Sequence, residues 1–195
     1  MDKTNAKRML EKAREHVGED LYIPRNFEDV GQSDFLRVYL WVIYVSGFRN
    51  SVVAKHFDAI KAAFHNLDLD KIVAMESIDA GTLSIRHQKK ADAFLRGCKM
   101  IHAEGWHDFK QRLKERRRAA LQDLPWIGPA TGQHMAMVLG LEDTEKADTW
   151  MKQCADACSA TVDQMVTFLS REYGLTRQQV DGYLWRYCLD NREIP

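Results

Sequence analysis

The fold is decided by the stretch Leu124-Pro125-Trp126-Ile127-Gly128-Pro129-Ala130-Thr131-Gly132. Gly128 permits a tight turn that a side chain would obstruct. Pro129 suits the first turn of a helix, because its missing N–H has no intrahelical partner there. Leu124 and Ile127 are apolar and would anchor the turn between two helices. The stretch therefore predicts a helix, a tight turn and a second helix whose first N–H groups can receive an anion.

The segment before this turn is strongly basic. Between residues 110 and 118 six cationic side chains stand against one acidic side chain, Glu115, and they are Lys110, Arg112, Lys114, Arg116, Arg117 and Arg118. Such a cluster beside an anion-binding turn suits a phosphodiester backbone, and the alternative is a solvated helix face. Lys plus Arg and Asp plus Glu number 28 each, so a claim of nucleic-acid binding must rest on local charge.

Helix signals occur along the whole chain, and no run alternates convincingly with period two. Hydrophobic residues make up 45% of the chain, which is enough to form a core. The sequence predicts N-caps at Ser33, Asn50 and Asp148, helix stops at Gly47, Gly105 and Gly140, and capping boxes at Thr161/Gln164 and Thr176/Gln179. Further helices are expected near residues 70–76, over 88–104, along 106–121 and over 131–139. The predicted fold class is all-α.

The segment from Leu124 to Ala155 resembles the helix-hairpin-helix (HhH-GPD) DNA glycosylase superfamily, which includes endonuclease III and the alkylpurine glycosylases. That family reads L-P-G-h-G-x-x-T-A, then a helix, a short loop and V/P-D-T-H; here LPWIGPATG is followed by HMAMVLG, LEDTEK and Ala147-Asp148-Thr149-Trp150. Upstream, FLRVYLWVIYVSGFRNSVVAKHF resembles the family's helix–turn–helix over the flipped base. IRHQKKADAFL resembles its Y-x-x-K-A helix, with His87 in place of the tyrosine. The resemblance covers about Asp34 to Ala155.

This resemblance implies two helical lobes with a helix-hairpin-helix beside a central cleft. Residues 34–135 would form a central lobe that includes the hairpin at about 121–132. Residues 1–33 and 136–195 would form a second lobe that carries Asp148.

By the same resemblance Asp148 is the catalytic residue. Breaking an N-glycosidic bond develops positive charge on the sugar, which a carboxylate stabilises, and the same group can orient or deprotonate the attacking water. The alternative is that Asp148 only caps a helix. Bifunctional family members carry a Schiff-base lysine two residues after the hairpin glycine, where this chain has Ala130. A monofunctional enzyme is therefore expected, although Lys146 and Lys152 flank the acid.

The resemblance also implies how the hairpin would bind DNA. The N–H groups of Trp126, Gly128 and Thr131 would face phosphate oxygens, supported by Lys110, Arg116 and Arg117. The backbone carbonyls of Gln122, Leu124 and Ile127 would bind a monovalent cation, K⁺ or Na⁺. The chain departs from the family at Trp126, where glycine is common, and at Trp150, which replaces a frequent histidine.

An enzyme that extrudes a base must fill the gap that the base leaves. Candidate wedge residues are Phe48 and Arg49, with Leu83 and Ile85 on an opposite loop, and candidate pocket residues are Trp41, Tyr44 and Trp150. The alternative for the wedge residues is packing at helix ends, and for the aromatic residues it is the core.

No iron–sulfur cluster is expected, because only Cys188 lies near the C-terminus. Cys154 and Cys158 lie one helical turn apart and would either flank a metal or be buried. The longest apolar run, Val38 to Val45, is too short to span a bilayer, and residues 1–16 lack the apolar stretch of a secretory signal. We expect an intracellular, cytoplasmic monomer, associated with the nucleoid in a bacterium.

The predicted activity is that of a monofunctional glycosylase of base excision repair, acting on double-stranded DNA with a damaged base. An alkylated purine is favoured slightly, because it leaves easily and needs little acid catalysis. Two alternatives remain: a non-catalytic helix-hairpin-helix module that only binds DNA or bridges repair proteins, and a bifunctional glycosylase/AP lyase.

Overall fold

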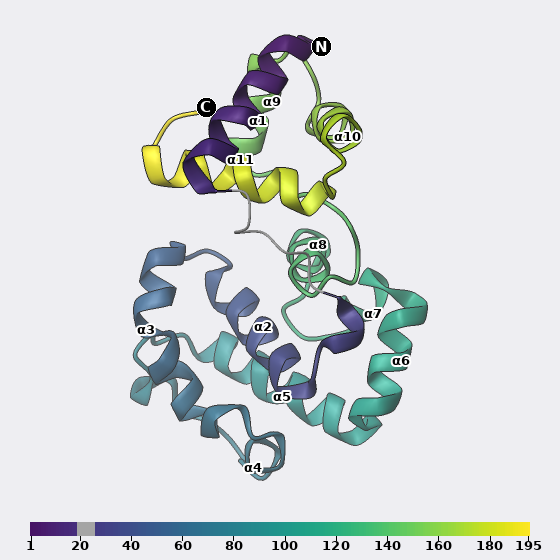
Figure 1. Cartoon of the computed structure of the whole chain (residues 1–195). Helices are drawn as coiled ribbons and strands as arrows, with labels where there is room; N and C mark the ends of the chain where they lie inside the picture. The colour runs from purple at the N-terminus through teal and green to yellow at the C-terminus, as the bar shows by residue number, and fades with distance from the viewer. Residues whose placement is uncertain (19–25) are drawn as a thin grey trace. The chain divides into compact units, whose positions relative to one another are not determined.

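The computed structural model describes residues 1–18 and 26–195, and the secondary structure of this part is entirely helical (Figure 1). Its elements are α1 (Lys3–Val17), η1 (Phe27–Asp29), α2 (Gln32–Val45), α3 (Asn50–Ala63), η2 (His65–Leu67), α4 (Leu69–Val73), η3 (Ala80–Thr82), α5 (Gln88–Glu104), α6 (Trp106–Arg116), α7 (Arg118–Leu121), α8 (Pro129–Val138), α9 (Thr149–Ala157), α10 (Val162–Tyr173) and α11 (Arg177–Asn191). The all-α prediction is confirmed.

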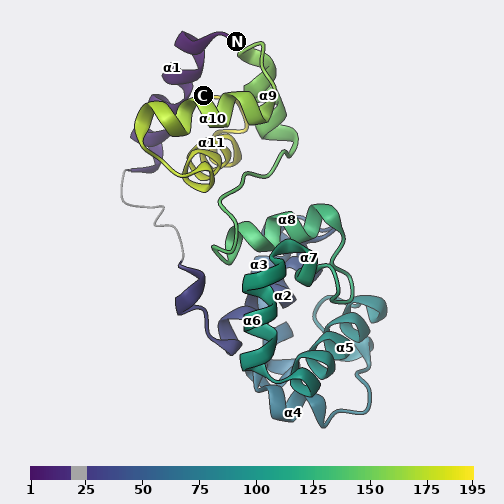
Figure 2. The ribbon, with the colours of Figure 1, turned by 90° about the vertical axis from the view of Figure 1, so that its right-hand side faces the viewer.

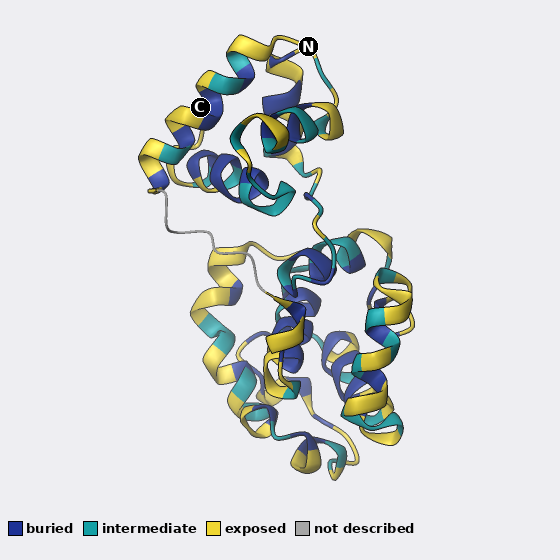
Figure 3. Cartoon of the chain, turned by 45° about the vertical axis from the view of Figure 1, so that its right-hand side comes forward, coloured by how far each residue is buried: buried dark blue, intermediate teal, exposed yellow. Residues whose placement is uncertain are grey.

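The chain divides into two compact units, each with its own buried core (Figure 3). The central unit runs from Asn26 to Glu142 and contains α2 to α8. The terminal unit contains α1 together with α9, α10 and α11. The central unit thus extends beyond the expected 34–135 at both ends. Phe27 and Val30 at one end and Leu139 and Leu141 at the other belong to its core, which accounts for the difference.

The central unit is built around α2, which packs against α3, α5 and α8 (Figure 2). Most of its side chains are buried, as expected of a helix that is covered on several sides. On α5, Gly97 leaves room for the ring of Tyr39, because an added Cβ there would overlap that ring. The α2–α5 packing therefore depends on a glycine inside a helix, where glycine is otherwise unfavourable.

The terminal unit brings the first and last helices together, since α1 packs across α11 (Figure 1). Buried side chains recur on α1 at helical spacing, and they are Ala6, Met9, Leu10, Ala13 and Val17. Asp2 caps α1 by accepting from the N–H of Asn5 at 2.9 Å, and its own N–H donates to the carbonyl of Cys158 at 2.7 Å. The start of α1 is thereby fixed to the end of α9.

Several expected helix boundaries are confirmed and others are wrong. Gly105 is a C-cap, and both capping boxes form, at Thr161 and at Thr176. The N-cap of α2 is Gly31 rather than Ser33, and that of α3 is Arg49 rather than Asn50, in both cases without a side-chain hydrogen bond. The helix expected along 106–121 divides into α6 and α7 at Arg117, whose φ is 50°.

All four cysteines are buried and form no disulfide, as the core interpretation of Cys154 and Cys158 predicts. Among the described residues, no helix is both long and apolar enough to cross a membrane, and no group of His, Cys, Asp and Glu side chains is arranged to hold a metal ion.

Candidate functional site

The turn between α7 and α8 is fixed from the inside of the central unit. Leu124 and Ile127 are buried, and the N–H of Ile127 donates to the carbonyl of Leu124 at 3.2 Å. The buried hydroxyl of Tyr39 donates to the carbonyl of Pro125 at 2.7 Å. Trp126, between them, has a φ of 72°, in the left-handed region that glycine adopts without strain. This chain therefore keeps a glycine-like turn with a tryptophan in it.

The start of α8 offers fewer donors than the sequence implied. Of the three N–H groups expected to face phosphate, that of Gly128 donates to Oγ1 of Thr131 at 2.8 Å and is occupied within the chain. The N–H groups of Ala130 and Thr131 lie in the first turn of α8, where a helix supplies no acceptor of its own. Of the expected cation ligands, the Leu124 carbonyl already accepts one hydrogen bond, from Ile127. The other two expected cation ligands, the carbonyls of Gln122 and Ile127, belong to the same turn between α7 and α8.

The basic side chains that were expected to bind DNA are engaged within the central unit. Lys110 donates to the carbonyls of Glu28 and Val30 at 2.7 and 2.9 Å, and Arg117 donates to the carbonyl of Leu141 at 2.5 Å. Arg116 pairs with Asp123 at 2.8 Å. The resemblance implies phosphate contacts for all three side chains, whereas the structure gives each of them an internal partner.

The remaining cations of this segment are paired in the same way. Arg112 binds both oxygens of Glu104 at 2.8 Å and also Asp123, and its hydrogen bonds hold the pKa of the Glu104 carboxyl below its usual value. Lys114 pairs with Glu28, and Arg118 pairs with Glu142. Because the acids come from other parts of the chain, the segment is basic in sequence but largely neutralised in the fold.

An aromatic cluster surrounds the exposed face of the turn. Trp126 is 36% exposed and its ring meets His87 edge-on, with centroids 5.7 Å apart. His87 in turn meets Phe48 edge-on at 6.2 Å, and Phe48 is 37% exposed. We call Phe48, His87 and Trp126 the aromatic cluster. It joins three segments of the central unit: the α2–α3 connection, the N-cap of α5 and the α7–α8 turn.

A buried lysine lies beneath this cluster. Lys90 is 1% exposed, and its Nζ donates to the carbonyls of Ile43 and Ser46 at the end of α2. The ammonium lies 5.0 Å from the centroid of Trp126 and 5.4 Å from that of Phe48, so that both rings present their faces to the cation. Burial lowers the pKa of Lys90 to about 8. This lysine occupies the K of the Y-x-x-K-A resemblance and closes the C-terminal end of α2.

Replacing Lys90 by methionine is expected to destabilise the central unit by about 2–4 kcal/mol, because the terminal carbonyls of α2 then lose their donor while remaining buried. The measurement is the free energy of unfolding from denaturant titration. Lys89→Met is the matched control, since Lys89 is the exposed neighbour on the same helix. Equal losses for the two variants would contradict a special role for Lys90.

The proposed wedge and pocket residues separate into exposed and buried sets. Phe48 and Arg49 are exposed, at the connection where a wedge was expected. Leu83 and Ile85 are 4% and 7% exposed and belong to the core, as does Tyr44, which is fully buried. Trp41 packs edge-on against Phe57 at 5.1 Å. For Leu83, Ile85 and Tyr44 the structure therefore corrects the assignment: hydrophobic packing holds these side chains inside.

Asp148 lies in the terminal unit, where it is the N-cap of α9 as expected. Its Oδ1 accepts from the N–H groups of Trp150 and Met151 at 3.0 and 3.1 Å. The side chain is partly exposed, and Oδ2 has no hydrogen-bond partner among the described residues. Trp150 packs against the core of the terminal unit. The first turn of α9 thus orients the carboxylate through Oδ1, while Oδ2 makes no hydrogen bond within the described part of the chain.

A second carboxyl group near Asp148 could not be recognised from the sequence. Asp181 on α11 is 5% exposed and accepts from the N–H of Lys146 at 3.3 Å, two residues before Asp148. Burial raises its pKa to about 7, and the charge of Asp148 acts in the same direction. The loop before Asp148 is also fastened by Arg177, which pairs with Glu145 at 2.6 Å. A buried acid and an ion pair therefore position the segment that carries Asp148.

Residues 26–142 and the terminal helices thus define an all-helical protein with an exposed tryptophan turn in one unit and an oriented carboxylate in the other. The chain matched no protein-family model, no curated protein and no solved structure.

Proposed function

We propose that this protein is a monofunctional DNA glycosylase, which binds DNA through the α7–α8 turn and hydrolyses the N-glycosidic bond of a damaged base with the help of Asp148. The observation that carries the proposal is the state of Asp148. Two backbone N–H groups hold Oδ1, so the carboxylate is preorganised, while Oδ2 is available to a sugar or a water. A cap alone would require only the first oxygen.

The chemistry assigns two tasks to this carboxylate. As the base departs with the bonding electrons, positive charge grows on the anomeric carbon and its ring oxygen, and a fixed negative charge stabilises it. The carboxylate can then accept a proton from the attacking water, which leaves an abasic sugar and the free base. Neither task requires a metal ion or a covalent intermediate.

The experiment is incubation of the protein with duplexes that carry methylated, deaminated or oxidised bases, followed by chromatographic detection of the released base. Release from at least one duplex supports the proposal, and alkylated purines are the first choice because they leave readily. Binding to all duplexes without release from any would overturn it in favour of a DNA-binding module.

A non-catalytic DNA-binding module is the second candidate function. The observation that favours it is the N-cap role of Asp148, whose Oδ1 accepts from the N–H groups of Trp150 and Met151, because a capping aspartate needs no catalytic role. The lesion panel separates the two candidates.

A strand-cleaving lyase activity is not expected, because the first turn of α8 carries the methyl group of Ala130 in the position of the nucleophilic lysine. Borohydride treatment of the protein with abasic DNA should therefore yield no covalent adduct on a denaturing gel. A known bifunctional glycosylase serves as the positive control. An adduct that disappears in Lys146→Gln or Lys152→Gln would reject this prediction.

A further inference from the structure

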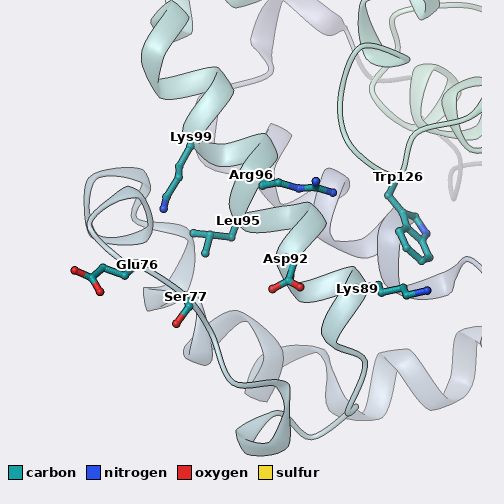
Figure 4. Close-up of a pocket in the computed structure, with 8 residues that line it drawn as sticks. All are labelled: Glu76, Ser77, Lys89, Asp92, Leu95, Arg96, Lys99 and Trp126. Carbon is teal, nitrogen blue, oxygen red and sulfur yellow. The ribbon is translucent and has the colours of Figure 1, made fainter.

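A groove of about 490 Å³ lies in the central unit between α5, the segment after α4 and Trp126 (Figure 4). Three cations line it, and they are Lys89, Arg96 and Lys99. With Asp92 they are spaced three, four and three residues apart, so they lie on one face of α5. In the close-up, Arg96 and Lys89 extend toward Trp126, whereas Lys99 lies at the other end of the row.

These cations differ from those of the basic segment, because they have no hydrogen-bond or ion-pair partner among the described residues. Asp92 lies on the same face but already accepts a hydrogen bond from the Gln88 amide at 2.7 Å. Glu76 also lines the groove, so its lining carries three positive charges and two negative charges, the latter on Asp92 and Glu76. Positive charge that is available to a ligand in this part of the unit therefore lies on α5 rather than on α6.

We propose that this groove binds a single strand of DNA, with its phosphates along Lys89, Arg96 and Lys99 and an unstacked base on the ring of Trp126. The row spans about 15 Å of helix, a length over which a strand presents several phosphates. Cations that follow the backbone, combined with an aromatic ring for stacking, are the usual elements of single-strand binding. Trp126 has a φ of 72° and is 36% exposed, so its ring is accessible at the surface there.

For the class of ligand, this inference rests on the proposed function, but it does not depend on Asp148 or on catalysis. The assay is therefore equilibrium binding to the full chain at several salt concentrations. The probe is an undamaged oligothymidine of fifteen nucleotides that carries a fluorescent label. Base release is measured separately, on the lesion duplexes. If release occurs but the variants below bind the oligonucleotide normally, the groove fails and the proposed function stands. If binding depends on the groove but no base is released, the groove proposal stands and the proposed function fails.

The decisive variant is Arg96→Gln/Lys99→Gln. Removing two phosphate contacts should weaken binding about tenfold or more at moderate salt and reduce the slope of log K against log salt by about 1.4. The matched control is Arg37→Gln/Lys55→Gln, which removes the same two charges from exposed positions of the same unit outside the groove. Equal effects of the two double variants would overturn the proposal, because only net charge would then matter.

The stacking part is tested by Trp126→Gly and Trp126→Phe. Glycine suits a φ of 72°, so the turn should persist while the ring is lost. Binding should weaken about tenfold in the glycine variant and remain near wild type in the phenylalanine variant. Unchanged binding in Trp126→Gly would overturn the stacking role. Binding of polyglutamate to the groove with an affinity equal to that of the oligonucleotide would overturn the proposal in favour of an acidic protein partner.

Discussion

Replacing Asp148 by asparagine is expected to lower the rate of base release by about 10²–10³-fold while leaving DNA affinity unchanged. The amide oxygen of asparagine can still accept the N–H groups of Trp150 and Met151, since asparagine is as good an N-cap as aspartate. What it lacks is the negative charge that stabilises the developing cation on the sugar. The variant therefore separates capping from catalysis.

The measurement is single-turnover release of the base from the best substrate of the lesion panel, alongside binding of the same duplex. Asp148→Ala is the companion variant. It should lose activity equally and also lose about 1 kcal/mol of stability, because the cap is removed. If Asp148→Asn retained full activity, Asp148 would be a helix cap only and the glycosylase proposal would fail.

The second large effect concerns the buried carboxyl of Asp181. Burial raises its pKa in the folded protein from the ordinary value of 3.8 to about 7, so the folded protein binds more protons than the unfolded chain between these two pH values. The stability contributed by the protonated acid is present in full below about pH 4 and is lost as the pH rises through about 7. A change of one in a pKa is equivalent to about 1.4 kcal/mol, so the loss amounts to about 4 kcal/mol.

Asp181→Asn is expected to remove this pH dependence, because the amide does not ionise and can still accept the N–H of Lys146. At pH 8 the variant should be more stable than wild type by about 4 kcal/mol, whereas near pH 4 the two should be similar. Denaturant titrations between about pH 4 and about pH 8.5 measure the difference.

The charged groups that face Asp181 besides Lys146 are Asp148 and Glu145. The control is Asp156→Asn, an exposed aspartate on α9, which should follow the wild-type pH dependence. A parallel pH profile for Asp181→Asn and wild type would show that this carboxyl is already ionised in the folded protein at neutral pH.

Because ionisation of Asp181 near neutral pH places a buried charge against the loop that carries Asp148, the pH dependence of base release should change in Asp181→Asn as well. Asp181 is a positioning residue in this scheme: it holds the loop through Lys146 and does not itself contact the sugar.

Features of the fold that depend on neighbouring residues were predictable from the sequence. Periodic apolar residues and capping residues indicated the helical class, the end of α5 at Gly105, the capping boxes at Thr161 and Thr176, and the N-cap role of Asp148. The caps at Ser33 and Asn50 were wrong by one or two residues, since neither helix uses a side-chain cap. Local hydrogen bonds and helical periodicity are encoded within a few residues, so the sequence alone determines them.

The electrostatics were decided by tertiary structure. Six clustered cations suggested a DNA-binding helix, but Glu28, Glu104, Asp123 and Glu142 approach them from elsewhere in the chain and neutralise several of them. The burial of Lys90 and Asp181 likewise depends on which helices pack together. So does the row of cations on α5 that has no hydrogen-bond or ion-pair partner among the described residues. A charge is defined by its residue type, but its strength depends on the solvent and partners around it, and only the three-dimensional arrangement supplies those.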